Sequence, residues 1–360
     1  MRVVLLALEV YGGEGGVQRY CRRLVRSLTE DGAVVTVMAL WDRADVAGVP
    51  SNVRFLGLAR SKWRMILHFL RALLVTRPHV ILYTHALFAP LMLPARLLRR
   101  TARQVLFVYG IEVWSDPGWL WRWPVRSCAD RIVSISRYTM QRMSSVYGTT
   151  PSRVRLLPPA IDPAPASAAD GSLQGAQRLV SVARLDPRDR GKNVDKVIDA
   201  MPDLLREFPD LHYYVIGDGH WRPTLEDQAR ERGVAGRVHF MGWLTDERKA
   251  RLYAGCHLFV LPSIHEGFGI VFLEAWQHGL PVVTSDQGAA PDVVRHGVDG
   301  CCVPPEPAAI ARAVSGILGD EERRRAMGRA GREHVITTYG HEDFRAALRG
   351  ILQECGPCAD

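Results

Sequence analysis

The chain has 360 residues, of which 47% are hydrophobic and 23% are charged. This balance is typical of a globular protein long enough for two domains, and it excludes wholesale disorder and a polytopic membrane protein. The formal net charge of +8 leaves nucleic acid, an anionic membrane surface and a small anionic substrate open as partners.

The first half of the sequence alternates short apolar runs with amphipathic segments. The opening MRVVLLALEV is too short for a secretion signal and is interpreted as a buried strand. Strands are expected at 3–8, 34–40, 80–84, 105–109 and 131–134, and helices at 17–29, 63–75 and 138–146. Continuous apolar strands that alternate with helices indicate a parallel sheet covered on both faces.

Four glycines lie between the first strand and the first helix, in YGGEGGVQRY, residues 11–20. A dinucleotide-binding turn requires G-x-G-x-x-G, but Gln18 stands where the third glycine belongs. Asp42 follows the second strand, as a ribose-binding acid would. The missing glycine nevertheless disfavours a dinucleotide-dependent oxidoreductase.

A change of composition divides the chain. Residues 157–177 are rich in Pro, Ala, Ser and Gly, which predicts a flexible linker. After it the alternation restarts, with strands expected at 179–183, 212–216, 238–241, 258–261 and 281–284, and helices at 194–208, 224–232, 247–254, 270–278, 308–318 and 321–335. Two doubly wound α/β domains are therefore expected, whose ligands bind beyond the carboxyl ends of the strands.

The most informative segment is SIHEGFGIVFLEAWQHGLPVVT, which begins at residue 263. Glu266 lies in a glycine loop, and Glu274 lies about one turn inside the helix that follows. The free N–H groups at the start of that helix favour an anion, and Gly267 and Gly269 let a ligand approach the backbone. The two carboxylates can accept hydrogen bonds from the hydroxyls of a sugar.

Two cations upstream extend this pattern. Arg184 follows the first strand of the second half, and Lys192 precedes its first helix. Either residue alone is as readily explained by a surface ion pair with Asp186 or Asp189. Together with the carboxylate loop, they indicate a site that neutralises a leaving diphosphate without a metal ion.

These residues resemble a known signature. E-G-F-G-x-x-x-L-E-A-x-x-x-G-x-P-V-V, preceded by S-x-A-R-L and K-N, is similar to the nucleotide-sugar motif of the retaining glycosyltransferases of family 4, the group 1 glycosyltransferases of polysaccharide and glycolipid biosynthesis. The resemblance covers essentially the whole chain. It implies the GT-B fold, in which two Rossmann-like doubly wound domains face each other across a cleft, here over residues 1–165 and 166–339, with a C-terminal helix near 340–355 that packs back on the first domain.

The resemblance also implies a reaction and a set of donor-binding residues. A hexosyl group would pass with retention from a UDP- or GDP-sugar to a saccharide or lipid-linked saccharide. Glu274 would hold the nucleotide ribose, Glu266 the donor sugar, and Arg184 and Lys192 the diphosphate. The other expected donor-side residues are Gly15, Gly16, Gly217, Gly219, Gly242, Trp243, Leu244, Gly267, Phe268, Gly269 and Ile270.

In the first half, the resemblance points to His85, at a strand end, as the side chain beside the transferred sugar. His85, Glu266, Arg184 and Lys192 form the expected catalytic set. The expected acceptor-side residues are Arg19, Glu112, Ser136 and Arg137.

Two features depart from the family pattern. The spacer between Arg184 and Lys192 is longer than usual, so Arg188 or Arg190 could share the phosphate role. Tyr109 stands where relatives often have a histidine before Gly110, which weakens any catalytic interpretation of that loop.

No metal ion or other cofactor is expected, because the sequence has no D-x-D metal-binding motif. Seven scattered cysteines, an odd number, do not suggest a disulfide framework. The terminal C-x-x-C of Cys355 and Cys358 is interpreted as a frayed tail rather than a redox centre.

Arginine alternates with Trp and Leu at 60–72, 96–103 and 119–126. This mixture suits an anionic membrane surface, although ordinary amphipathic helices with solvated basic faces would also produce it. Nucleic acid is disfavoured, because no zinc finger or RNP-like motif occurs. We therefore expect a cytoplasmic protein, peripheral on the inner face of the cytoplasmic membrane, that acts in cell-envelope synthesis.

Three other functions remain as alternatives: a NAD-dependent oxidoreductase, a non-catalytic nucleotide-sugar-binding protein of the GT-B fold, and a GT-B epimerase or phosphorylase. Nucleotide release from a UDP- or GDP-sugar, measured with and without EDTA, separates them.

Overall fold

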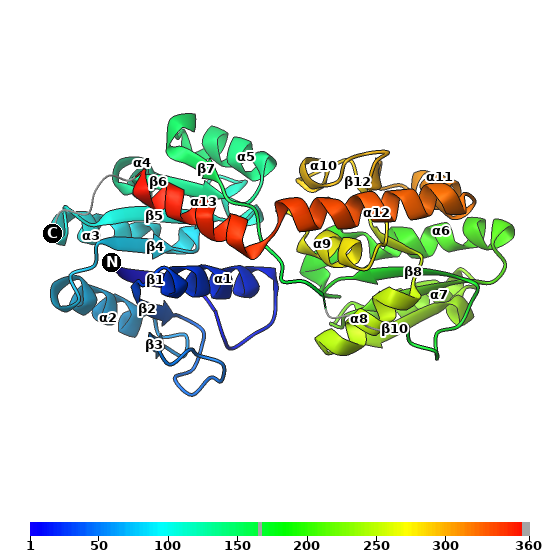
Figure 1. Ribbon diagram of the computed structural model, residues 1–360, viewed down its shortest axis with the longest axis horizontal. Coiled ribbons are helices and arrows are strands. Elements are labelled where there is room, and N and C mark those ends of the chain that lie inside the picture. The colour runs from blue at the N-terminus through cyan, green and yellow to red at the C-terminus, as the bar shows by residue number, and fades with distance from the viewer. Residues whose placement is uncertain (165–167, 355–360) are drawn as a thin grey trace. The chain divides into compact units, whose positions relative to one another are not determined.

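The computed structural model describes residues 1–164 and 168–354 of the chain. It divides into two compact units (Figure 1). Unit 1 comprises Met1–Ala160 together with the C-terminal segment that starts at His341, and unit 2 comprises Ile161–Gly340. The expected domain boundary at 165/166 and the cysteines Cys355 and Cys358 lie outside the described residues.

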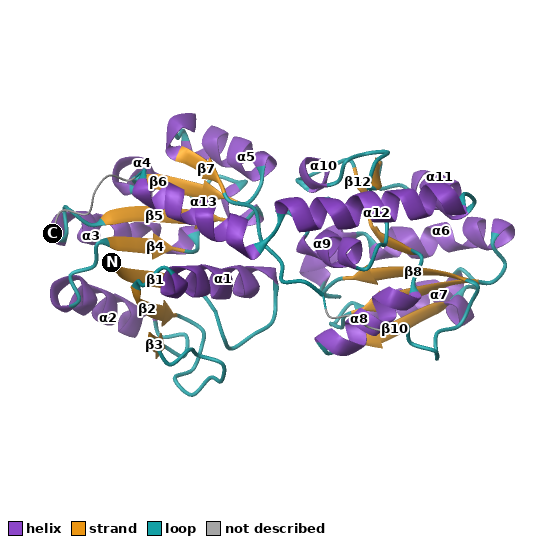
Figure 2. Ribbon diagram, in the orientation of Figure 1, coloured by secondary structure: helices purple, strands orange, loops and turns teal. Residues whose placement is uncertain are grey.

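Unit 1 is built on a seven-stranded parallel sheet of order β3-β2-β1-β4-β5-β6-β7 (Figure 2). Its strands are β1 (Arg2–Ala7), β2 (Val34–Ala39), β3 (Val53–Gly57), β4 (Val80–Tyr83), β5 (Arg103–Val108), β6 (Arg131–Ser134) and β7 (Val154–Leu156). Its helices are α1 (Gly16–Glu30), α2 (Lys62–Val75), α3 (Met92–Leu98), α4 (Trp119–Cys128), α5 (Arg137–Tyr147) and α13 (His341–Gln353).

Helices cover both faces of this sheet. Leu106 and Val108 of β5 belong to a hydrophobic core that also contains buried residues of α2, α3, α4 and α5. Between them Phe107 points the other way, where its ring packs edge-on against Tyr20 of α1. This alternation is what buries every residue of a central strand, and it explains the continuous apolar runs in the sequence.

Helix α13 returns to unit 1 and packs on α1 (Figure 1). The Phe344 ring meets Tyr20 edge-on with 5.3 Å between ring centroids. Arg345 and Arg349 both pair with Asp31, just beyond α1, each at 2.6 Å. Apolar contact and charge therefore fix the same two helices together.

Unit 2 has a six-stranded parallel sheet of order β10-β9-β8-β11-β12-β13 (Figure 2). Its strands are β8 (Gln177–Val182), β9 (Leu211–Ile216), β10 (Val238–Gly242), β11 (Leu258–Leu261), β12 (Val282–Ser285) and β13 (Gly300–Val303). Its helices are α6 (Val194–Glu207), α7 (Arg222–Glu231), α8 (Asp246–Gly255), α9 (Ile270–Gln277), α10 (Ala290–Val293), α11 (Pro307–Leu318) and α12 (Glu321–Thr338).

The segment expected to be a flexible linker is in part folded onto unit 2, which corrects that expectation. The Asp170 N–H donates to the Arg251 carbonyl at 3.2 Å, and the Gln174 N–H donates to the Tyr214 hydroxyl at 2.7 Å. Leu173 lies so close to Gly255 that a Cβ there would approach it to 2.5 Å. Leu173 and these two hydrogen bonds thus fix a segment whose composition alone predicts a flexible linker.

Two parts of unit 2 that are distant in the sequence meet where the chain enters and leaves it. The Ile161 N–H donates to the Tyr339 carbonyl at 3.0 Å. No helix among residues 1–164 and 168–354 is both long enough and apolar enough to cross a bilayer.

Candidate functional site

The loop after β11 and the turn before α6 are held together in unit 2. The Ile264 N–H donates to the Gly191 carbonyl at 2.8 Å. Gly191 also lies beneath the ring of His265, where a Cβ would come within 2.2 Å of Nδ1. Lys192 is thereby brought to Glu266, and its ammonium pairs with the Glu266 carboxylate. Both side chains are largely buried, so the loop presents a neutralised pair rather than an isolated charge.

A second lysine–glutamate pair joins helices α8 and α9. The Glu274 carboxylate, on α9, accepts from Lys249 of α8 at 3.0 Å and from the Tyr253 hydroxyl at 3.4 Å. Glu274 is 8% exposed, and burial of a carboxylate at this level requires such partners. The two expected ligand-binding carboxylates thus each have a lysine partner.

The cations of the long spacer have separate environments. Arg184 is 71% exposed on its side chain and pairs with Asp189 at 3.3 Å. The Arg190 guanidinium lies over the ring of Trp221, 5.6 Å from its centroid, while the Arg188 side chain is 93% exposed. Arg190 is therefore already in contact with an aromatic ring. Arg184, which precedes the spacer and lies two residues after the end of β8, is the arginine nearest to that strand.

Two glycines allow the backbone to pack tightly around the site. At Gly217, with φ 126°, a Cβ would approach the Ala183 carbonyl oxygen to 1.9 Å. At Gly269, with φ 92°, a Cβ would come within 2.2 Å of the Phe272 ring. Gly269 precedes α9 directly, and its carbonyl accepts the Phe272 N–H at 2.9 Å. The first two N–H groups of the helix, those of Ile270 and Val271, have no intrahelical partner and remain at the loop.

The remaining expected donor-side residues lie around this loop and at the end of β10. Gly219 follows Gly217 after β9, and Gly242, which ends β10, accepts a hydrogen bond from the Gly217 N–H at 2.9 Å. Trp243 is exposed and Leu244 half-buried, and the buried Phe268 packs edge-on against Tyr339. Gly267 lies between Glu266 and Phe268, and Ile270 is the first residue of α9.

His85 in unit 1 caps the 3₁₀ turn η1 (Ala86–Leu91). Its Nδ1 accepts the Leu87 N–H at 3.0 Å. Burial lowers the pKa of His85, and the nearby Glu112 carboxylate opposes this effect. A neutral ring that accepts at Nδ1 carries its proton on Nε2, so His85 offers a hydrogen-bond donor there.

The start of the glycine loop of residues 11–20 is held by one acid, Asp42, in unit 1. Asp42 is buried and accepts the N–H groups of Val10, Tyr11 and Gly12 at 2.9–3.0 Å. The acid that the sequence placed as a possible ribose ligand is thus a loop anchor. Gly15 caps α1 and Gly16 begins it.

The four expected acceptor-side residues have different environments. Arg19 forms an ion pair with Glu14 at 3.6 Å. Glu112 accepts the Tyr109 N–H, and Ser136 caps α5 by accepting the Thr139 N–H at 3.2 Å. Arg137, at the start of α5, is exposed. Of these side chains, those of Glu112 and Ser136 are used to stabilise their own backbone segments.

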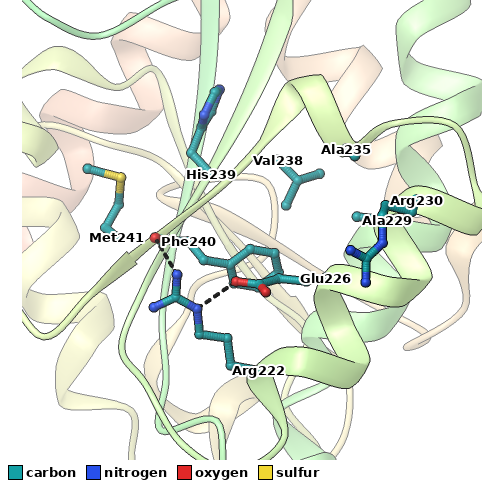
Figure 3. Close-up of a pocket in the computed structure, with 9 residues that line it drawn as sticks. All are labelled: Arg222, Glu226, Ala229, Arg230, Ala235, Val238, His239, Phe240 and Met241. Atoms are coloured by element: carbon teal, nitrogen blue, oxygen red, sulfur yellow. Dashed lines mark hydrogen bonds and ion pairs between the residues drawn. The ribbon is translucent and has the colours of Figure 1, made fainter.

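A hollow of about 470 Å³ lies in unit 2 between α7 and β10, the strand at one edge of the sheet (Figure 3). Arg222 spans it, donating to Glu226 at 2.7 Å and to the Phe240 carbonyl at 3.3 Å. None of the expected site residues lines it. The chemistry-bearing residues therefore gather elsewhere, at the carboxyl ends of the strands.

One group of side chains in the described part of the chain has the spacing of a metal site: Glu30, His341 and Glu342, where α1 meets α13. His341 pairs with Glu30 at 2.6 Å, and this contact lowers the pKa of Glu30 more than any other. The α1 helix separates Glu30 from the glycine loop by roughly 20 Å, given a rise of 1.5 Å per residue. This cluster joins two helices and is remote from the loop.

Comparison with known proteins identifies the family. Residues 14–165 match the model of Glycosyltransferase Family 4, and residues 167–334 match that of Glycosyl transferases group 1. A Mycobacterium tuberculosis protein, GDP-mannose-dependent alpha-(1-6)-phosphatidylinositol monomannoside mannosyltransferase, is 32% identical over 291 residues, 74% of each chain. The chain belongs to the group 1 glycosyltransferases.

Solved structures show that this glycosyltransferase has the GT-B fold. Sucrose-phosphate synthase from Thermosynechococcus elongatus superimposes with a TM-score of 0.82 at 20% identity, over 98% of this chain and 99% of that one. HepE from Anabaena, in complex with UDP and glucose, gives 0.79 at 18% identity, over 97% and 99%. At these identities the likeness concerns the fold.

Sequence reasoning missed Lys249 in this glycosyltransferase. Its position in an ordinary polar helix gives no signal, since the paired Glu274 lies 25 residues further along the chain. It also missed the anchoring role of Asp42, which accepts the N–H groups of Val10, Tyr11 and Gly12 at the start of the glycine loop. Both roles depend on contacts between elements that the sequence does not relate.

Proposed function

We propose that this glycosyltransferase moves a hexosyl group, with retention of configuration, from a UDP- or GDP-sugar to a saccharide or lipid-linked saccharide. The observation that carries the proposal is the glycine loop before α9, bracketed by the Lys192–Glu266 and Lys249–Glu274 pairs. The names of the mycobacterial relatives support a GDP-sugar donor and a glycolipid acceptor. The HepE complex with UDP-glucose keeps a UDP-sugar open as the donor.

The proposed chemistry divides between charge and hydrogen bonding. Glu274 would accept from the ribose hydroxyls and Glu266 from the donor sugar. Lys192 and Arg184, with the first N–H groups of α9, would stabilise the charge that develops on the leaving diphosphate. No metal ion or other cofactor is required in this proposal, because these cations supply the positive charge.

The acceptor attack would follow a front-side path. An oxygen of the departing phosphate would take the proton of the acceptor hydroxyl while the new glycosidic bond forms on the same face. His85 would donate from Nε2 to the transferred sugar. We further propose that the protein works in envelope polysaccharide or glycolipid synthesis, peripherally at the inner face of the cytoplasmic membrane.

A donor screen tests this function. Purified protein is incubated with UDP-, GDP- and ADP-sugars and candidate acceptors, and nucleotide release is measured with and without EDTA. We expect one nucleotide class to be turned over, EDTA to have no effect, and Lys192→Ala and Glu274→Ala to abolish turnover. Full activity in both variants, or an absolute requirement for a divalent ion, would contradict the proposal.

The stereochemistry needs its own measurement. The product anomer, determined by NMR from the coupling constant of the new glycosidic linkage, should match the anomer of the donor. Inversion would refute the front-side path while leaving glycosyl transfer itself intact.

A further inference from the structure

Helix α2 carries an exposed apolar stripe opposite its buried one. Met65, Phe69 and Leu73 face the core of unit 1. On the other side Trp63 is 82% exposed and Leu67 67% exposed, a spacing that places both side chains on one face at 3.6 residues per turn. Leu74, 60% exposed, falls on the same stripe two turns later. A solvated helix face is ordinarily polar, so this stripe requires an explanation.

The neighbouring helices continue this surface. Helix α3 contacts both α2 and α4, so the three lie side by side on one face of the sheet (Figure 1). Leu97 of α3 is exposed, as are Trp119 and Trp123 of α4. We call the surface made by Trp63, Leu67, Leu74, Leu97, Trp119 and Trp123 the α2–α4 surface. Three of its six residues are tryptophans.

The chain segment that contains α2 and α3 carries basic residues and no acidic ones. From residue 46 to residue 111 the sequence contains no Asp or Glu, against nine Arg and one Lys. On α2, Lys62, Arg64 and Arg71 are exposed, and residues 1–164 and 168–354 provide none of the three with an ion pair. This stretch without acids includes all of α2 and α3, and the three exposed cations of α2 lie beside its exposed apolar stripe. Arg96 of α3 and Arg122 of α4, by contrast, pair with Asp130 and Asp116.

We propose that the α2–α4 surface is the docking surface of this protein for an anionic phospholipid bilayer. Its tryptophans and leucines would enter the boundary between headgroups and acyl chains, while Arg64 and Arg71 extend to the lipid phosphates. Tryptophan suits this boundary because its ring is apolar and its N–H still needs a polar partner. Unpaired arginines beside exposed apolar residues favour a phosphate-bearing surface over an apolar protein groove.

The inference rests on the proposed function in one respect, the supply of a lipid-linked acceptor at the same membrane. Lipid binding itself requires neither donor nor acceptor. A chain that does not bind vesicles would lose the docking surface and the proposed membrane location but keep the proposed glycosyl transfer, and a chain without turnover would keep the docking surface. The full chain is sedimented with vesicles of phosphatidylcholine alone and of phosphatidylcholine with phosphatidylglycerol. We expect binding to the anionic vesicles that weakens as salt is raised.

Two variants and a matched control locate the contact. Arg64→Gln/Arg71→Gln should reduce partition to anionic vesicles about 25-fold, since each basic residue near such a surface contributes about fivefold. Trp63→Ser/Leu67→Ser should reduce it even at low salt. Ile336→Ser/Arg325→Gln, which removes an exposed apolar and a basic residue from α12, should bind like the native chain.

A quenching experiment places the tryptophans at the bilayer. Brominated lipids should quench the native protein, and less so Trp63→Phe/Trp119→Phe, which keeps the apolar surface and therefore the binding. Turnover with a water-soluble acceptor should be the same in all these variants. Absence of binding to anionic vesicles would overturn the proposal, as would equal binding by the control and the α2 variants. A dimer in lipid-free solution that Trp63→Ser/Leu67→Ser dissociates would also overturn it, in favour of a protein partner.

Discussion

Lys192 and Lys249 occupy similar environments, yet the proposed chemistry gives them different roles. Each pairs with a buried carboxylate, Lys192 with Glu266 in the loop and Lys249 with Glu274 in α9, so loss of either lysine leaves a poorly partnered charge. Such a loss costs about 1–3 kcal/mol of stability in either case. Only Lys192 is expected to stabilise the leaving diphosphate.

We therefore expect the two methionine substitutions to separate in steady-state kinetics. Lys192→Met should lower kcat by about 10²–10³, the usual effect of losing a group that stabilises transition-state charge. Lys249→Met should chiefly raise KM for the donor, because Glu274 loses the partner that orients it. Thermal unfolding of both variants controls for the shared stability loss. Equal effects on kcat would refute the division of roles.

His85 combines a structural and a proposed chemical role on its two ring nitrogens. Nδ1 accepts the Leu87 N–H, which leaves Nε2–H for the transferred sugar. The Oδ1 atom of an asparagine at this position can accept in place of Nδ1, and the Nε2 atom of a glutamine can donate in place of the histidine Nε2–H. His85→Asn should therefore keep stability within about 0.5 kcal/mol but lose turnover.

The reciprocal variant completes the comparison. His85→Gln should retain more turnover and lose about 1 kcal/mol of stability, because the cap is broken. Chemical denaturation and nucleotide release, measured on both proteins, test this assignment. If one of the two variants were both the more stable and the more active, the assignment of separate roles to the two nitrogens would be wrong.

At the scale of elements, the helix starts of α1 in unit 1 and α9 in unit 2 both follow a glycine, for different reasons. Gly269 has φ 92° and a phenylalanine ring where its Cβ would lie. Gly15 has extended backbone, and its Cβ would meet only the end of the Gln18 side chain, which can move aside. The two positions form a matched pair for alanine substitution.

Gly269→Ala should destabilise the protein by about 1–3 kcal/mol and weaken donor binding, because both the backbone and the Phe272 contact must shift. Gly15→Ala should cost less than about 1 kcal/mol. Urea denaturation and isothermal titration with the nucleotide diphosphate measure the two effects. Equal losses of stability and of donor affinity in the two variants would show that neither the positive φ of Gly269 nor the nearby Phe272 ring matters.

The sequence predicted the alternation of elements well where apolar periodicity was strong. The strands at 131–134 and 258–261 have the expected bounds, and the other expected elements differ by one to three residues, with α12 extending three residues beyond its expected end. Strand β3 was missed because Arg54 interrupts its short apolar run and the strand lies at the sheet edge. Helix α3 was missed because Pro94 and a run of leucines obscure any periodicity.

Site prediction had a different limit. The pattern around Glu266 and Glu274 is local and was legible, whereas pairings depend on distant elements. Arg190 was expected as a candidate for the phosphate, yet its guanidinium lies over Trp221, 31 residues away in the sequence. No spacing rule connects these two residues, so only the fold could relate them.

At the scale of the whole molecule, buried and half-buried histidines make the free energy of unfolding depend on pH. Burial lowers the pKa of His85, His212, His239, His257 and His278, and that of His257 to about 4. Arg237 donates to His212 Nε2, so the neutral His212 donates from Nδ1 to His239 at 2.7 Å. Protonation of His212 would disrupt this chain of bonds.

The sign of the effect follows from these shifts. Below the unfolded-state pKa of about 6.5, the unfolded chain binds more protons than the folded one. The free energy of unfolding should therefore fall as the pH drops from about 6.5 towards 4, and it should be flat with respect to these groups above 6.5. Urea midpoints between pH 8 and pH 5 test this. His257→Gln should reduce the slope, whereas an unchanged or inverted slope would contradict the assignment.

The return of α13 to unit 1 has a consequence for biosynthesis. Unit 2 is, in chain terms, an insert between Ala160 and His341 of unit 1. The ribosome therefore delivers unit 2 in full before the helix that packs on Tyr20 emerges. Unit 1, although synthesised first, is completed last, and until then its nascent chain leaves Asp31 and the Tyr20 ring without their α13 partners.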